Sequence, residues 1–170
     1  MSYKVWNQPM STTAPMAGVA IANGTKTMLQ IATPSSRQAQ VIAWGYSFSV
    51  TPPGITTVEL LQTDVAATVT AHVAAGIQPS DPNAPASLCA GGINLTGYTA
   101  TVEGSVAATR TFDNQQLGIA AGNDDLVYTY QFMPDEERPI IAVSKFLRVR
   151  VTGTSTTPLF LCWVVFKELG

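Results

Sequence analysis

Large apolar residues occupy every second position between residues 42 and 50, and the positions between them hold only alanine, glycine and serine. Because side chains alternate between the two sides of a β-strand, this pattern predicts a strand with one side in a core. The other side, with its small residues, must lie close to another surface or remain wet. Pro52, Pro53 and Gly54 end the predicted strand, since proline cannot donate a ladder hydrogen bond.

Similar short segments follow one another along the chain, separated by turn signals rich in proline, glycine and asparagine. We expect strands at residues 16–22, 26–33, 38–50, 56–63, 105–112, 126–133, 139–143, 145–152 and 157–167. Asn23 and Gly24 predict a tight turn between the first two strands, and residues 113–125 are expected to form turns. Residues 65–73 fit a helical stripe or a strand face, and their β-branched residues favour a strand.

The last two predicted strands differ in pattern. In residues 145–152, Leu147, Val149 and Val151 alternate with Arg148 and Arg150, which predicts an inward apolar side and an outward charged side. Residues 157–167 are apolar on both sides, and such a strand is buried on both. We therefore expect this strand to contact a second subunit as well as its own core. The expected interface residues are Phe160, Cys162, Trp163, Val164 and Phe166.

The first 15 residues show no strand or helix period and contain Pro9 and Pro15. They predict an extended N-terminal arm, which is either a frayed terminus or a tether that docks on a neighbouring protein. In the second case Tyr3 and Trp6 are the expected anchoring residues, because aromatic side chains dominate binding energy at interfaces. Residues 16–170 are then a single domain.

Many short strands, and no convincing helix, predict an all-β fold with the strands in two sheets. About eight strands match a jelly-roll β-sandwich. The chain has no visible internal repeat, which argues against propellers and solenoids.

The composition narrows the functional classes. Charged residues make up 12% of the 170 residues, about half of the usual ~25%, which suits a surface buried against neighbours. The net charge is −2 and no basic stripe is present, so we expect no binding of nucleic acid. No apolar segment approaches the ~20 residues of a membrane span. The start lacks the apolar region of a secretory signal, which argues against export by the general secretory pathway and predicts synthesis in the cytoplasm.

Candidate chemistry is sparse. His72 is the only histidine, too few for a histidine-cluster metal site; no placed nucleophile accompanies it, so a structural role is expected. Cys89 and Cys162 are not expected to form a disulfide. The segment 122–125 (Gly-Asn-Asp-Asp) lacks the ligand spacing of a calcium loop and predicts a turn. We expect no catalytic residue, no cofactor and no metal, hence no enzyme.

Several segments, mostly after residue 26, resemble small virion proteins of tailed bacteriophages of actinobacterial hosts. They are residues 41–48, 58–63, 67–73, 77–79, 104–110, 145–151 and 162–165. The resemblance implies a jelly-roll capsid decoration (cement) protein, made in the bacterial cytoplasm, that binds the exterior of a phage head. It also implies a homotrimer whose partner is the major capsid protein.

Two other functions remain open from the sequence. The first is a tail-associated or receptor-binding jelly-roll module that recognises host glycans through exposed aromatics, for which Tyr98, Tyr128 and Tyr130 are the candidates. The second is a hydrolase on the same scaffold that depends on His72.

Overall fold

The computed structural model describes residues 1–10, 14–118, 126–134 and 138–170. In this part of the chain two antiparallel sheets form, and a 3-10 turn covers Ala74–Gly76. Sheet A contains β1 (Ser2–Trp6), β2 (Val19–Ala20), β4 (Gln38–Phe48), β7 (Ile77–Pro79), β10 (Val127–Gln131), β11 (Ile140–Ile141) and β13 (Leu159–Leu169). Sheet B contains β3 (Asn23–Ala32), β5 (Thr56–Thr63), β6 (Thr68–Ala71), β8 (Gly97–Val102), β9 (Arg110–Leu117) and β12 (Phe146–Thr154).

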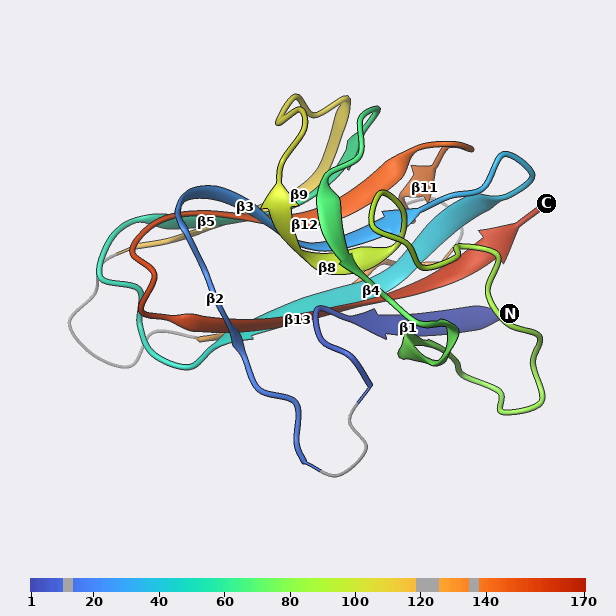
Figure 1. Ribbon diagram of the computed structural model, residues 1–170, viewed down its shortest axis with the longest axis horizontal. Coiled ribbons are helices and arrows are strands. Elements are labelled where there is room, and N and C mark those ends of the chain that lie inside the picture. Colours follow the sequence, from blue (N-terminus) through green and yellow to red (C-terminus); the bar gives the residue numbers. More distant parts are fainter. Residues whose placement is uncertain (11–13, 119–125, 135–137) are drawn as a thin grey trace.

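The main path through sheet A is β10-β4-β13-β1-β7, and sheet B has the order β6-β8-β3-β12-β5-β9. In Figure 1, β13 and β1 lie in the lower part of the picture and β3, β12 and β5 in the upper part. The expected all-β fold with two sheets is confirmed, while the jelly-roll connectivity stays a prediction.

One large apolar core fills the space between the sheets, and a small separate cluster contains Ala67, Val69 and Ala100. Sheet A contributes Trp44, Tyr46 and Phe48 from β4 together with alternate residues of β13, and sheet B contributes alternate residues of β3, β5 and β12. Each square ångström of apolar surface withdrawn from water stabilises the fold by about 25 cal/mol. The alternation that predicted these strands is therefore the alternation that builds the core.

A β-bulge shifts this alternation in β4. Val165 of β13 lies opposite Ala43 and the next residue, Phe166, lies opposite Val41, so Ile42 is the extra residue. Val41 is consequently buried while Ile42 is only half-buried. Val50 lies beyond the strand and is exposed. The expectation that Ile42 and Val50 face the core with Trp44 was wrong for these two positions.

The N-terminal segment is not an arm outside the sandwich. Residues 2–6 are strand β1, which lies between β13 and β7 and pairs with β13 from Ser2 opposite Lys167 to Trp6 opposite Trp163. Tyr3 and Val5 point into the core and are buried. The predicted boundary at residue 15 was therefore wrong, because the short alternation from Ser2 to Trp6 is a core strand.

Other strands have bounds or partners that differ from the prediction. The strand expected at 105–112 is β9, which begins at Arg110 and continues to Leu117 through positions expected to be turns. Asn23 and Gly24 belong to the start of β3, and β2 pairs with β13 instead of forming a hairpin with β3. Residues 68–71 form β6, which confirms the strand alternative for that segment.

Candidate binding surface on sheet A

The outer side of β1 and β13 carries two tryptophans. Trp6 lies directly opposite Trp163 in the antiparallel ladder, with ring centroids 6.2 Å apart and planes inclined at 56°. Both side chains are half-buried. We call the outward-facing side chains of these two strands the tryptophan face; they are Lys4, Trp6, Leu161, Trp163 and Val165.

Lys4 lies between the two indoles. Its Nζ atom is 4.4 Å from the ring centroid of Trp6 and 4.4 Å from that of Trp163. An ammonium over an indole face is attracted by the negative π surface. Partial burial lowers the pKa of Lys4 below its usual value. Within the part of the chain that the structure describes, neither Lys4 nor the neighbouring Lys167 forms an ion pair.

The small residues of β4 explain how Trp163 lies on the sheet. Gly45 is opposite Trp163, and a Cβ atom at this position would lie 2.9 Å from Cζ2 of the indole and 2.7 Å from the carbonyl oxygen of Tyr128. The indole therefore lies across the backbone of Gly45. This is the close approach that the small-residue side of the strand predicted.

A hollow of about 140 Å³ adjoins the tryptophan face near Leu159, at the N-terminal end of β13. Leu159 and Leu161 form its apolar wall, and Gly18, which has no side chain, and the small Ser47 also line it. Leu159 is 41% exposed, and Val127 on the edge strand β10 is 67% exposed. The outer side of sheet A thus combines aromatic rings, aliphatic side chains and a recess of the size of one side chain.

The position of Trp6 is fixed from behind. The His72 imidazole donates from Nε2 to the carbonyl oxygen of Trp6 over 2.7 Å. The next residue, Asn7, is buried and binds β13 twice: its Nδ2 donates to the carbonyl of Phe160, and its Oδ1 accepts from the amide of Cys162. Trp6 is therefore presented by a rigid strand end.

His72 is a buried structural histidine, as expected, and its ring contacts Tyr98 edge-on. The Nε2–H tautomer follows from the carbonyl acceptor, and it leaves Nδ1 as an acceptor without a hydrogen-bond partner among the described residues. Burial lowers the pKa of His72, and the bond to Trp6 only partly opposes this shift. The ring is consequently neutral at physiological pH.

The structure separates the five predicted interface residues into two groups. Trp163 is on the outer side of β13, whereas the remaining four belong to the core of this same chain; they are Phe160, Cys162, Val164 and Phe166, each 0% exposed. These four cannot contact another subunit without unfolding, so their assignment to an interface was wrong. The error has a simple physical origin: both sides of β13 are apolar, but only one side faces outward.

The two residues predicted to anchor an arm also differ. Tyr3 is buried in the core, stacks on Phe166 with centroids 5.6 Å apart, and donates its hydroxyl proton to the carbonyl of Pro85. Trp6 is the partner of Trp163. The sequence named both tryptophans in separate roles, and the structure brings them together on one surface. Only the register of β1 against β13 reveals this, and no sequence pattern encodes it.

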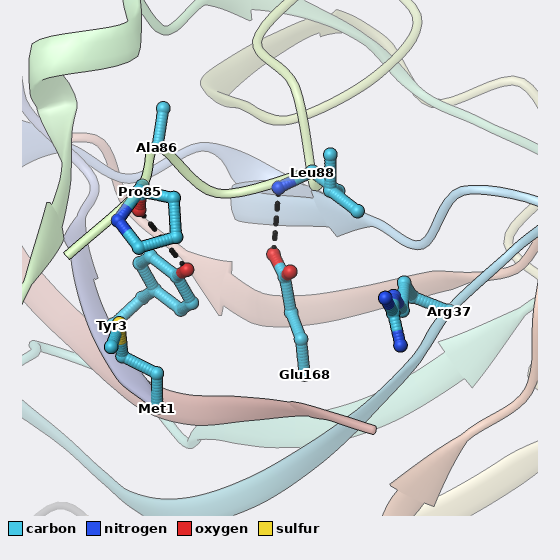
Figure 2. Close-up of a pocket in the computed structure, with 7 residues that line it drawn as sticks. All are labelled: Met1, Tyr3, Arg37, Pro85, Ala86, Leu88 and Glu168. Atoms are coloured by element: carbon cyan, nitrogen blue, oxygen red, sulfur yellow. Dashed lines mark hydrogen bonds between the residues drawn. The ribbon is translucent and has the colours of Figure 1, made fainter. Parts of the chain in front are cut away.

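A second hollow, of about 290 Å³, lies beside the ends of β1 and β13 (Figure 2). Glu168 projects into it, and its Oε1 accepts from the Ser87 hydroxyl at 2.5 Å and the Leu88 amide at 2.8 Å. Arg37 borders the opposite side of the hollow in Figure 2. Sequence reasoning did not select this site. Its carboxylate is already held by the 87–89 segment, which indicates that Glu168 fixes a loop.

The candidate glycan-binding tyrosines do not form one pocket. Tyr98 packs on His72, while Tyr128 contacts Trp44 and Tyr46 and donates its hydroxyl to Asp113 at 2.7 Å. Tyr130 packs against Phe132. Tyr128 and Tyr130 belong to sheet A and Tyr98 to sheet B.

Both cysteines are buried and free. Burial raises the pKa of Cys89 to about 12 and raises that of Cys162 as well, so neither is a reactive thiolate. Residues 122–125 and the charged segment 135–137 lie outside the described residues. In the described ranges no group of three or more histidine, cysteine or carboxylate side chains is placed to hold a metal ion. None of the described helices is long and apolar enough to cross a membrane.

Comparison with protein families, with curated proteins and with solved structures found no match to this chain.

Proposed function

We propose that this chain is a structural virion protein, a jelly-roll decoration protein that binds the exterior of a phage head as a trimer and stabilises it. The observation that carries the proposal is the tryptophan face. Two tryptophans on neighbouring strands are held rigidly on the outer side of a sheet, beside exposed Leu159. Contiguous apolar surface of this kind marks sites of protein–protein contact.

The composition and the resemblance support the same proposal. Tryptophan is the side chain most enriched at binding hot spots, and a rigid backbone lowers the entropy cost of binding. The low content of charged residues suits a surface that is covered by neighbours. The segments that resemble phage virion proteins include 162–165 of β13, which contains Trp163.

Such a protein would act by burial. Where capsid subunits meet, it would cover the joint and withdraw apolar area from water at ~25 cal/mol per Å². A closed three-fold arrangement would let three modest footprints act together through their high effective concentration.

The test compares the wild type with Trp6→Ala and Trp163→Asp. We expect both variants to remain folded by circular dichroism, since both side chains lie outside the core. Trp163→Asp should abolish trimers in analytical ultracentrifugation or lose binding to heads of the encoding phage in co-sedimentation, and Trp6→Ala should weaken binding. Val73→Asp is the matched control, because Val73 is 65% exposed and lies outside the tryptophan face.

A wild-type protein that is monomeric and does not bind heads would reject the proposal. Antibody labelling at the tail tip, with specific binding on a glycan array, would favour the receptor-binding alternative instead.

A further inference from the structure

The tryptophan face has one charge sign. Lys4 lies at its centre, and Lys167 continues the same side of β13 opposite Ser2. The carboxylate nearest in sequence, Glu168, turns to the other side of the strand and binds the 87–89 segment. The outer side of β1 and β13 therefore presents cations and apolar groups without a carboxylate.

Lys4 is held but not neutralised. The two indoles contact its ammonium from two sides, and within the described ranges its N–H groups form neither a hydrogen bond to oxygen nor an ion pair. Three other cations of the described residues have carboxylate partners: Lys145 pairs with Asp64, Arg148 with Glu103 and Arg150 with Glu59. An ammonium that is partly desolvated and lacks an anion gains most from a carboxylate supplied by a partner.

The hollow next to Leu161 indicates that the partner also contributes an apolar side chain. Its volume of about 140 Å³ and its lining by Leu159, Leu161 and Phe48 fit one aliphatic or aromatic side chain. The recess lies at Leu159 and Leu161 of β13, and Lys4 of β1 pairs with Val165, so the two lie on either side of Trp163.

We propose that the tryptophan face docks an acidic segment of a capsid subunit, with a carboxylate at Lys4 and an apolar side chain in the hollow beside Leu161. This inference rests on the proposed function and specifies its partner. The same face of a second copy is a poorer occupant, because two such faces brought together would oppose Lys4 and Lys167 to like charges. Contact with a different surface of another copy is the alternative that the cross-linking below tests.

The experiment measures binding to heads of the encoding phage for Lys4→Arg, Lys4→Gln and Lys4→Glu. Arginine should bind like the wild type, since it keeps the charge and stacks on indoles. Glutamate should bind at least about 30-fold more weakly, because it sets two carboxylates against each other in a desolvated contact. Lys26→Glu is the matched control: Lys26 is on β3 of sheet B, and its Nζ donates to the carbonyl of Ala20.

Zero-length carbodiimide cross-linking, which joins a lysine amine directly to a carboxylate, gives an independent measurement. Mass spectrometry should find Lys4 or Lys167 linked to an aspartate or glutamate of the capsid protein. A link from Lys4 to a carboxylate of another copy of this chain would overturn the inference and assign the face to self-association. Heads that bind the wild type and Lys4→Glu equally would also overturn it, while a wild type that binds no heads would instead reject the proposed function.

Discussion

The outward-facing cations of the two sheets differ in their partners. On sheet B, Arg148 and Arg150 point away from the core, as predicted, but Arg148 is 0% exposed because other parts of the chain cover it. Its guanidinium donates to the carbonyls of Glu103, Ser105 and Val65 and pairs with the carboxylate of Glu103 at 3.5 Å. On sheet A the corresponding side carries Trp6 and Trp163, and Lys4 pairs with no carboxylate of the described chain.

The difference separates structural from functional charge. On sheet B, Arg148 and Arg150 hold the 103–106 segment against the strand. Their planar guanidinium groups donate several hydrogen bonds to its carbonyl groups. On sheet A the ammonium of Lys4 contacts two indole rings and forms no ion pair within the described residues. A buried charge with many internal partners indicates a role in folding, whereas the half-buried Lys4 is available for the binding role that we propose.

The largest effect is expected from Arg148→Met. The variant keeps most of the side-chain volume but leaves Glu103 and three carbonyl groups without their cation, so we expect unfolding free energy to fall by about 3 kcal/mol. Urea denaturation measures it. Lys145→Met is the control: its ion pair with Asp64 is exposed, and such pairs contribute at most about 1 kcal/mol. Equal losses of unfolding free energy for the two variants would contradict a structural role of Arg148 in holding the 103–106 segment.

A smaller effect is expected from Gly45→Ala on sheet A. The added methyl group would press on the Trp163 indole and on the Tyr128 carbonyl, so either the ring lifts or β10 shifts. We expect a loss of about 1–3 kcal/mol, together with a change in tryptophan fluorescence. Gly118→Ala is the matched control, because no atom lies within 4 Å of the added Cβ there. An unchanged stability would show that the indole does not lie tightly on Gly45.

The smallest effect is expected in the pH dependence of the unfolding free energy, which His72 should influence through its bond to β1 of sheet A. Because burial lowers the pKa of His72, the unfolded chain takes up a proton at higher pH than the folded chain. The stabilisation from the neutral His72 is fully present above the unfolded pKa of about 6.5 and is lost as the pH falls towards the folded pKa, by at most about 1.4 kcal/mol per pH unit. His72→Gln can still donate to the Trp6 carbonyl but does not titrate.

Urea unfolding of both proteins between about pH 7 and about pH 5.5 should therefore show a steeper loss for the wild type. Hydrogen exchange should locate the loosening at β1 and not at β12, since His72 binds the strand end that carries Trp6. Identical pH profiles would exclude His72 as the cause.

Sequence patterns predicted the long strands well, because β4, β5, β12 and β13 carry an alternation that depends only on which side is buried. β5 was predicted at its observed bounds, Thr56–Thr63. The failures include β1, which was missed, and β9, whose bounds were wrong; these are short or polar strands whose identity depends on a distant partner. Ser2–Trp6 is recognisable as a strand only when β13 is beside it.

The candidate site was predicted as residues but not as a surface. Trp6 was selected as an aromatic residue of the predicted arm and Trp163 as a residue of a strand that is apolar on both sides, so the two were assigned to separate roles. Lys4 was not predicted as a site residue, since a lysine in a polar terminal segment matches no binding pattern by itself. Its significance comes from two rings contributed by strands that are far apart in sequence.

The pairing of β1 with β13 also has a consequence for how the protein is made. Residues 2–6 leave the ribosome before their neighbours in the ladder, residues 163–167, which follow about 160 positions later. Until then Tyr3 and Val5 have no strand to join on that side, and closing so long a loop is slow. The tryptophan face is thus completed only after β13 has been synthesised, so a nascent chain without β13 would lack the surface that we propose for capsid attachment.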